Sequence, residues 1–267
     1  MSDFPPIHWN YNKIIAGSQY SIYDFEYISK FNFEKWMNII GNTNLFTISI
    51  EDYLMTLCEK HIEYCKSGII EFNELYDLIN KLNDYISTSS TDLFFRLSYR
   101  SAKDVPEGRM PITNGKQIIN AIIKSERCFY DLIAHKYHKN KGLSLTSINI
   151  ILIPWKNCNQ SRELRCFVYN KQLVAITNQF PNETWSFNHM EDYLISKINT
   201  FINDLWSNNK DLYNSCVVDI EIDKFMNIDL IEFNPYEKKG STSAILFDWI
   251  NDKDILFNNN NKIILRH

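Results

Sequence analysis

Two neighbouring segments late in the chain carry oxygen-bearing side chains at spacings that suit a divalent metal ion. Asp219 lies in the run Asp-Ile-Glu-Ile-Asp, and Glu232 and Asn234 lie in the run Asp-Leu-Ile-Glu-Phe-Asn-Pro that ends at Pro235. Side chains alternate between the two faces of a β-strand, so Glu232 and Asn234 point the same way and a hairpin partner can bring Asp219 beside them. Carboxylate and amide oxygens are the ligands that Mg²⁺ prefers, and its open positions accept phosphate oxygens. The pattern therefore predicts a site for a nucleotide with Mg²⁺.

The alternative is that these acidic side chains only solvate the outer face of an amphipathic hairpin. The residues around them favour the metal site, because a buried carboxylate without a cation or a hydrogen-bond partner is energetically costly. The neighbouring apolar residues, which would bury both strands, are Val217, Val218, Ile220, Ile222, Leu230, Ile231 and Phe233.

Length and composition restrict the class of protein. With 267 residues, of which 45% are hydrophobic, the chain can bury a core as one large α/β unit or as two closely joined lobes. The formal net charge of −4 argues against a surface for nucleic acid, which usually needs a basic footprint. No apolar run approaches the roughly 20 residues of a membrane span, and the first residues do not resemble a signal peptide. We expect a cytoplasmic protein that binds neither nucleic acid nor membranes.

The six cysteines indicate reduced thiols rather than a zinc site. No two of them form a Cys-x-x-Cys pair, and several lie in apolar segments where a thiol packs as a small hydrophobic side chain. His135 and His138, with Cys128 upstream, come nearest to a zinc motif, but the neighbouring lysines favour an exposed basic helix end.

Hydrophobic periodicity predicts an α+β chain with two lobes. Apolar residues repeat at three and four positions in the predicted helices, which cover residues 49–62, 71–83, 115–138 and 190–207. Apolar runs bounded by turn residues predict strands at 93–99, 148–153, 164–168, 173–178 and, as a hairpin, 216–235. The segment from Lys136 to Gly142 is the predicted linker between the lobes. We therefore expect an N-terminal extension at 1–26, a first lobe at 27–140 and a second lobe at 141–267.

A metal-bound phosphate chain also needs fixed positive charge, which the predicted strand at 93–99 and its exit offer. Arg96 alternates with Phe95 and Leu97, so its guanidinium points away from the apolar face and can bind phosphate oxygens. Arg100 and Lys103 follow at the strand exit. The alternative is a surface or ion-pair arginine, which is the commoner role of one arginine on a strand.

A second strand repeats this combination of charge and apolar residues. Glu163 and Arg165 lie on one face and Leu164 on the other. The alternative to a nucleotide contact here is a cross-strand ion pair.

Several longer motifs occur in order along the chain. They are Ile151-Leu-Ile-Pro-Trp155, Glu163-Leu-Arg-Cys-Phe-Val168 with Leu173–Asn178, Asp219, Leu230-Ile-Glu-Phe-Asn-Pro235 and Leu246-Phe-Asp-Trp249. In order and spacing they resemble the cell division cycle protein 123 family, a branch of the ATP-grasp fold. The similarity extends from about Phe33 to Trp249, most of the chain. The resemblance implies an α+β ATP-grasp fold, in which two α/β lobes hold ATP between two antiparallel sheets and Mg²⁺ chelates its phosphates.

The resemblance also implies roles for individual residues. The implied ATP contacts are Arg96, Arg100, Ser101, Ile153, Pro154, Trp155, Lys156, Glu163, Arg165, Asn178, Asp219, Glu232 and Asn234, of which the last three would also hold Mg²⁺. The adenine hinge would run from Ile151 to Lys156.

Three positions depart from the family's pattern. Arg96 replaces the usual lysine, which keeps the charge but changes its reach. Glu232 replaces the usual aspartate, and its extra methylene matters for a metal bound at about 2.1 Å. The loop from Tyr236 to Ser241 is longer and more basic than expected.

For function, the resemblance implies an ATP·Mg²⁺-binding protein that helps to assemble eukaryotic translation initiation factor 2 through its gamma subunit. A different class of function is an ATP-grasp ligase that activates a carboxylate as an acyl phosphate for amide bond formation. A ligase needs cations that hold the acceptor carboxylate, and Arg100 and Lys103 are the candidates. A third possibility, a scaffold without nucleotide, follows if Glu232 does not support a metal.

Overall fold

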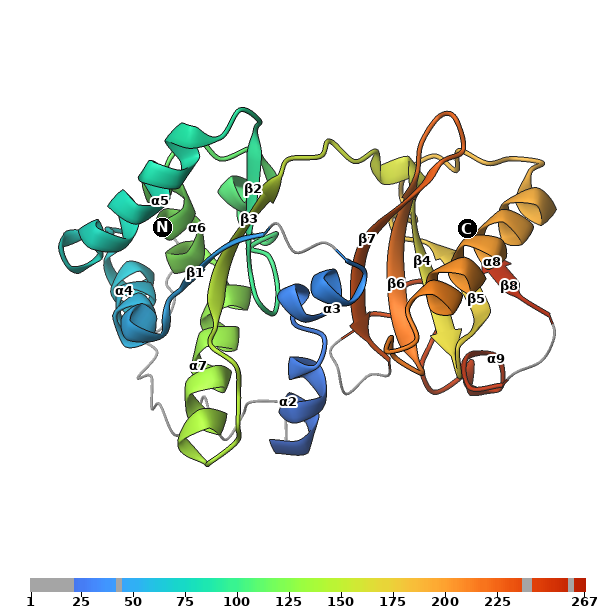
Figure 1. Cartoon of the computed structure of the whole chain (residues 1–267), viewed down its shortest axis with the longest axis horizontal. Coiled ribbons are helices and arrows are strands. Elements are labelled where there is room, and N and C mark those ends of the chain that lie inside the picture. The colour runs from blue at the N-terminus through green and yellow to red at the C-terminus, as the bar shows by residue number, and fades with distance from the viewer. Residues whose placement is uncertain (1–21, 42–44, 237–241, 259–261) are drawn as a thin grey trace. The chain divides into compact units, whose positions relative to one another are not determined.

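The structure, a computed structural model, describes residues 22–41, 45–236, 242–258 and 262–267. It divides into two compact units, coloured along the chain in Figure 1. The described residues of Met1–Ser29 and Asn44–Lys156 form unit 1, and those of Lys30–Thr43 and Asn157–His267 form unit 2. Residues 1–21 of the predicted extension and 237–241 of the predicted basic loop lie outside the described residues.

Unit 1 is built on an antiparallel three-stranded sheet in the order β1-β3-β2. The strands are β1 (Phe46–Ser49), β2 (Leu93–Leu97) and β3 (Asn149–Pro154). Phe95 lies opposite Leu152 and Leu97 opposite Ile150, and all four side chains are buried in the core of the unit. Because side chains alternate along β2, Arg96 points to the other face of the sheet.

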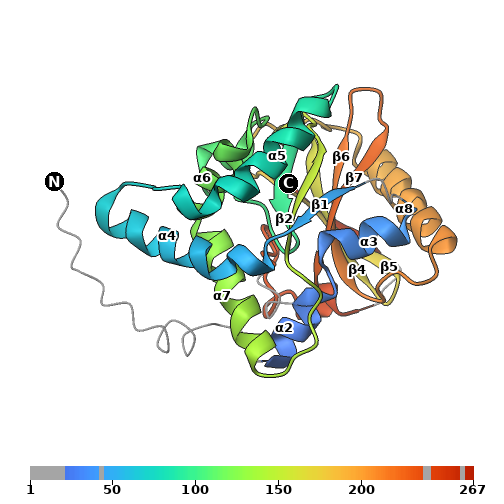
Figure 2. The same ribbon diagram turned by 60° about the vertical axis from the view of Figure 1, so that its left-hand side comes forward.

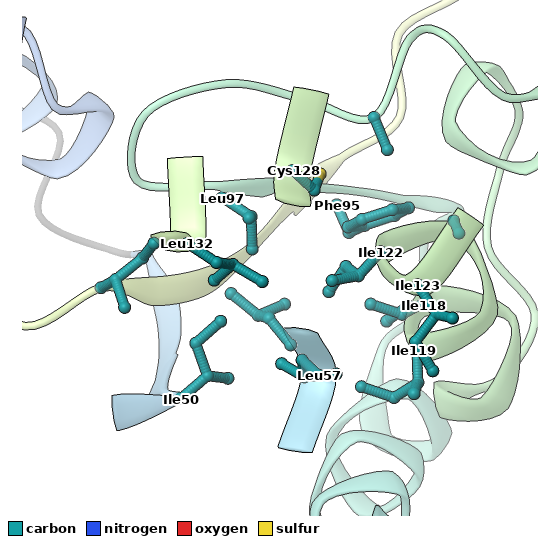
Figure 3. Packing of buried hydrophobic residues seen from close by; sticks show 14 of the residues in the cluster. Ile50, Leu57, Phe95, Leu97, Ile118, Ile119, Ile122, Ile123, Cys128 and Leu132 are labelled. Atoms are coloured by element: carbon teal, nitrogen blue, oxygen red, sulfur yellow. The ribbon is translucent and has the colours of Figure 1, made fainter. Parts of the chain in front are cut away.

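Helices pack on the apolar face of this sheet. They are α2 (Ile22–Ser29), α4 (Leu54–Ser67), α5 (Tyr76–Thr88), α6 (Gly115–Lys124) and α7 (Glu126–Asn140), with 3-10 turns η1 (Glu51–Tyr53), η2 (Asn73–Leu75) and η3 (Pro106–Arg109). Figure 3 shows how their side chains meet Phe95 in one cluster, among them Leu57 of α4, Ile118 of α6 and Leu132 of α7.

Unit 2 is built on a five-stranded sheet in the order β7-β6-β4-β5-β8. Its elements are α3 (Phe33–Ile39), η4 (Gln160–Arg162), β4 (Glu163–Tyr169), β5 (Gln172–Asn178), α8 (Glu191–Asn208), β6 (Cys216–Ile222), β7 (Ile228–Pro235), α9 (Lys253–Leu256) and β8 (Ile264–Arg266). Neighbouring strands are antiparallel except β5 and β8, which are parallel.

One face of the sheet in unit 2 is covered by α3 and α8. Trp36 of α3 and Trp206 of α8 pack edge-on against Phe233 of β7, at ring-centroid distances of 5.2 and 6.1 Å. Figure 2 shows α8 running along the sheet. Val218 and Cys166 lie on the same face as Phe233 and are fully buried. This burial explains why every second residue of these strands is apolar in the sequence.

The predicted α+β class with two sheets is confirmed, and β4 to β7 lie where the sequence predicts them. The prediction of one continuous helix over residues 115–138 is wrong, since these residues form two helices, α6 and α7. Ser125 breaks the helix because its backbone turns to an extended ψ of 117°, while its side chain caps α7 by accepting a hydrogen bond from the Cys128 amide.

The end of α7 differs from the sequence prediction. The helix continues to Asn140, so most of the predicted linker is helical. The chain instead leaves unit 1 for the last time after Lys156. His135 and His138 are buried, and the expectation of an exposed helix end was wrong for them. At helical spacing they continue the stripe of Cys128 and Leu132 that faces the core, whereas Lys136 and Lys139 are exposed.

Candidate functional site

Charged side chains of unit 2 form a row on the face of the sheet opposite α3 and α8. Arg165 of β4 pairs in register with Asp219 of β6, and Asp219 pairs with Glu232 of β7. Residues that are paired on adjacent strands project to the same face. The structure therefore brings together three residues that the sequence singled out in separate segments.

Arg165 and Asp219 form a buried, two-point ion pair. The Arg165 Nε and Nη2 atoms donate to the two Asp219 carboxylate oxygens, each at 2.8 Å. Arg165 is 6% exposed and Asp219 is 4% exposed. Burial by itself would lower the pKa of Arg165, but the charge of Asp219, the hydrogen bonds to it and the charge of Glu232 together raise this pKa. The guanidinium is thus a permanent cation in a fixed orientation.

Asn234 completes the predicted metal-ligand set. Its Nδ2 atom donates to Asp219 Oδ2 at 3.0 Å and to Glu232 Oε1 at 3.4 Å. Glu232 and Asn234 are two residues apart on β7 and share a face, as the alternation in the sequence predicts.

The chemistry of this donor set fits a hard cation. A carboxylate accepts up to about four hydrogen bonds or metal contacts, so Asp219 keeps acceptor capacity beyond its bonds to Arg165 and Asn234. In the described part of the chain, no group of three His, Cys, Asp or Glu side chains could hold a metal ion. The amide of Asn234 would therefore have to supply the third ligand, and it must turn about its last side-chain bond to present Oδ1.

Further acidic residues extend the row along the same face. Glu163 lies two residues before Arg165 and pairs in register with Glu221. The Glu221 carboxylate accepts a hydrogen bond from the Asn159 amide at 2.9 Å, which fixes the segment that enters β4. Glu163 therefore shares the face of Arg165, as predicted.

Asn178, by contrast, is not brought to this face. It pairs in register with Leu164, which projects toward α8. Asn178 is buried, and its Oδ1 accepts a hydrogen bond from the Phe180 amide at 3.0 Å. The β5 residue that pairs with Arg165 is the buried Thr177.

In unit 1, Arg96 shares its face of the sheet with residues of the predicted adenine strand. It pairs in register with Ile151, and Phe94 pairs with Ile153 on the same face. Arg96 is 7% exposed, and its Nε and Nη2 atoms donate to the carbonyls of Leu97 at 3.4 Å and Tyr99 at 3.3 Å. An arginine, a phenylalanine and two isoleucines thus line one surface of β2 and β3.

Arg100 and Ser101 follow β2 but have a different setting. The Arg100 Nε atom lies 3.0 and 3.1 Å from the two carboxylate oxygens of Asp131 on α7, and Nη2 lies 2.6 Å from one of them. Ser101 is buried in the loop that follows. This ion pair ties the loop to α7 inside unit 1.

The predicted hinge residues lie at the end of unit 1. β3 ends at Pro154, and the Trp155 amide donates to the Asp92 carbonyl at 2.8 Å. The Trp155 ring lies 5.8 Å from the ring of Phe94, centroid to centroid, and Lys156 is exposed.

The row on the sheet of unit 2 contains residues that sequence reasoning missed. Thr177 continues the row from Arg165, and Arg266 of β8 pairs in register with Thr177. The carbonyl of Ser243 accepts a hydrogen bond from Arg165 Nη1 at 2.6 Å. Thr177 could have been found from the hairpin register of β4 and β5, but a backbone carbonyl and a parallel three-residue strand leave no signal in the sequence.

None of the helices in the described ranges is long and apolar enough to cross a bilayer.

Comparison with known proteins places this architecture in a family. A solved structure of Cdc123 from Schizosaccharomyces pombe matches with a TM-score of 0.70 and 19% identity, over 91% of this chain and 97% of that one, so the two share a fold. A Dictyostelium discoideum protein named translation initiation factor eIF2 assembly protein is 28% identical over 191 residues, which are 68% of this chain and 48% of the relative. The match thus spans about half the length of that relative. A CDC123-like protein of Acanthamoeba polyphaga mimivirus is 26% identical over 262 residues, 89% of this chain and 76% of that protein. The sequence model of the D123 family matches residues 58–263, and the chain belongs to this family.

Proposed function

We propose that the chain binds ATP with Mg²⁺ and acts as an assembly factor for eukaryotic translation initiation factor 2, through the gamma subunit of that factor. The observation that carries the nucleotide site is the buried pair of Arg165 and Asp219 with Glu232 and Asn234 beside it. The partner rests on membership of the D123 family and on the name of the Dictyostelium relative. Such a role belongs in the cytoplasm, where the sequence predicts the protein to be.

Energetics support a binding role for the buried pair. Taking two charges out of water is expensive, and apolar residues of similar volume often stabilise a fold as well or better. Arg165 and Asp219 lie on adjacent strands whose other buried residues are mainly apolar. A charged pair in this place is better explained by a ligand than by the stability of the sheet.

The hydrogen-bond donors of Arg165 that remain, and the oxygen atoms beside it, suit a ligand that contains phosphate and a metal ion. A guanidinium carries five N–H donors, of which Asp219 takes two and Ser243 one, so donors of Arg165 remain for phosphate oxygens. Asp219, Glu232 and Asn234 would hold Mg²⁺, which when bound would neutralise phosphate charge. Arg96, Ile153 and Trp155 of unit 1 stay predicted ATP contacts from the family resemblance.

The ligase alternative gains no support from the cations proposed for it. Arg100 makes a two-point ion pair with Asp131, so binding an acceptor carboxylate would require breaking that pair. Lys103 is exposed. We therefore favour binding of ATP linked to partner assembly over transfer of phosphate to a small acid.

Calorimetric titration with ATP in the presence and absence of Mg²⁺ tests the nucleotide site. The Asp219→Asn variant keeps the shape of the side chain and removes its charge, and should weaken Mg²⁺-dependent ATP binding by on the order of tenfold or more. Asp229→Asn is the matched control, because Asp229 is an exposed carboxylate on the same hairpin. Equal affinity of wild type and Asp219→Asn would remove the metal assignment.

A binding assay with purified gamma subunit tests the partner. We expect wild-type protein to retain the subunit on a column more strongly with ATP and Mg²⁺ than without, and Asp219→Asn to lose this dependence. ADP release is followed in the same samples. Rapid ADP production with a small carboxylic acid and no gamma subunit would instead establish the ligase.

A further inference from the structure

The segment 242–257 lies on the charged face of the sheet in unit 2 and contacts Arg165 directly. The Ser243 carbonyl accepts a hydrogen bond from Arg165 Nη1 at 2.6 Å. Phe247 packs edge-on against Phe167 at a centroid distance of 5.5 Å, and Phe167 is two residues from Arg165 on the same face of β4. The position of this segment therefore determines where one acceptor of Arg165 lies.

Arg266 holds the same segment from β8. Its Nη1 and Nη2 atoms each lie 2.7 Å from a carboxylate oxygen of Asp252, and Nη1 also donates to the Leu246 carbonyl at 3.0 Å. The guanidinium lies 4.1 Å from the ring centroid of Phe247. Through Thr177, Arg266 is in the same cross-strand row as Arg165, so two arginines anchor one segment from the same row of the sheet.

The backbone between the two anchored carbonyls is strained. Ile245 lies between Ser243 and Leu246 and has a φ of 58°, in the left-handed region that a β-branched residue rarely adopts. Such a conformation persists only where the surrounding contacts enforce it. With Arg266 removed, Ile245 can relax to a negative φ, and this relaxation would move the Ser243 carbonyl away from Arg165.

We propose that Arg266 is a positioning residue for Arg165: it fixes segment 242–246, whose Ser243 carbonyl orients the guanidinium that pairs with Asp219. The consequence for ATP binding rests on the proposed function, whereas the orientation of Arg165 is independent of it. The competing reading is that Arg266 and Asp252 only brace the sheet edge.

Nuclear magnetic resonance of the arginine side-chain N–H groups, in protein without nucleotide, separates the two readings. In Arg266→Gln the Arg165 Nε–H, which donates to Asp219, should exchange with water about tenfold faster than in wild type. Release of the Ser243 carbonyl, the acceptor of Nη1, removes one of the bonds that hold the guanidinium and so lowers the free energy of its opening. Arg266→Lys keeps the charge without the two-point geometry, and its Arg165 Nε–H exchange rate should lie between those of wild type and Arg266→Gln. The Nη1–H of Arg162, which donates to the Asp223 carbonyl, serves as the internal reference, since a general loosening of the sheet would speed the exchange of both arginines.

Arg162→Gln is the matched control variant. Arg162 also donates to a backbone carbonyl, that of Asp223 at 2.9 Å, and lies over an aromatic ring, that of Phe187 at 5.5 Å. Among the described residues its hydrogen bonds go to the end of β6 and the residue after it, rather than to segment 242–257. It should leave the Arg165 exchange rate unchanged. If Arg266→Gln does not fold, Asp252→Asn removes the same anchor from the other side. An unchanged Arg165 rate in the folded variant, or equal acceleration of Arg162, would overturn the proposal.

A calorimetric titration of ATP with Mg²⁺ tests the consequence for binding. If wild type binds and Arg266→Gln binds about tenfold more weakly, with Arg162→Gln unchanged, the proposal is supported. Equal affinity of wild type and Arg266→Gln would refute the effect of Arg266 on the nucleotide. If wild type itself does not bind ATP, the proposed function fails, and the exchange rates of Arg165 still decide whether Arg266 positions it.

Discussion

Replacing the buried ion pair by apolar residues should separate stability from binding in unit 2. In the single variant Asp219→Leu, Arg165 keeps its charge at 6% exposure and loses two hydrogen bonds of 2.8 Å. Breaking a buried pair from one side typically costs about 3–5 kcal/mol. Glu232 stays close enough to compensate part of the charge, so we expect a loss near 3 kcal/mol, at the lower limit.

The double variant Arg165→Met with Asp219→Leu should behave differently. It removes both charges together and leaves no unpaired buried ion, so its stability should lie within about 1 kcal/mol of wild type. Binding of ATP with Mg²⁺ should nevertheless be lost, because the variant lacks both a metal ligand and a phosphate donor.

Amide hydrogen exchange of Cys166 and Val218, which flank the pair, measures this stability for unit 2 alone, whereas whole-chain melting would mix the two units. A 3 kcal/mol loss in Asp219→Leu corresponds to exchange on the order of 100-fold faster. If the double variant were at least as unstable as Asp219→Leu, replacing the pair by apolar residues would itself be costly, and the energetic support for a binding role would be lost. If it folded and still bound ATP, the site would be wrongly assigned.

Two further outcomes concern unit 1. Burial lowers the pKa of His135 and His138 below the ordinary value of 6.5, so the unfolded chain binds protons that the folded unit does not, and stability should fall as the pH drops below 6.5. The loss of stability is at most about 1.4 kcal/mol per pH unit for each histidine. Amide hydrogen exchange of α7, corrected for the intrinsic exchange rates, measures it between pH 7.5 and pH 5. Protection that stays constant over this range would contradict the prediction. Gly115→Ala should destabilise by about 1–3 kcal/mol, since overpacking is costly and the new Cβ would lie 2.5 Å from the Ile79 carbonyl oxygen. Amide hydrogen exchange of Ile118 and Ile119 on α6 measures this loss in unit 1 against Lys116→Ala, an exposed control on the same helix.

The arrangement of the hairpin that carries the proposed metal ligands could be predicted because its residues lie within one local pattern. Glu232 and Asn234 share a face by simple alternation, and a short turn returns the chain past Asp219. The pairing of Arg165 with Asp219 could not be predicted in the same way, because α8 separates β4 from β6 in the sequence and nothing local sets their register. An ion pair was only one of the alternatives for Arg165.

The strands that the sequence did not predict are too short to show an alternating hydrophobic pattern. β1 has four residues and β8 has three, too few for alternation to be recognised, and β8 forms only because β5 offers it a parallel edge. Arg266 therefore could not be linked to the site. The burial of His135 could have been predicted, since His135 continues a helical stripe that faces the core. Its polar side chain, however, does not count as apolar when the hydrophobic period is read.

A β-bulge explains how the run Asp-Leu-Ile-Glu-Phe-Asn fits a sheet with one apolar and one charged face. Strict alternation from Glu232 would place Leu230 among the charged residues. The register instead shifts between Asp219 and Ile220, so that Glu232 pairs with Asp219 while Leu230 pairs with Ile220, and Ile231 is the extra residue. Leu230 then joins the apolar face and Asp229 pairs with Glu221. Two apolar residues in succession between acidic ones therefore encode the bulge, and the bulge in turn sets Glu232 directly opposite Asp219.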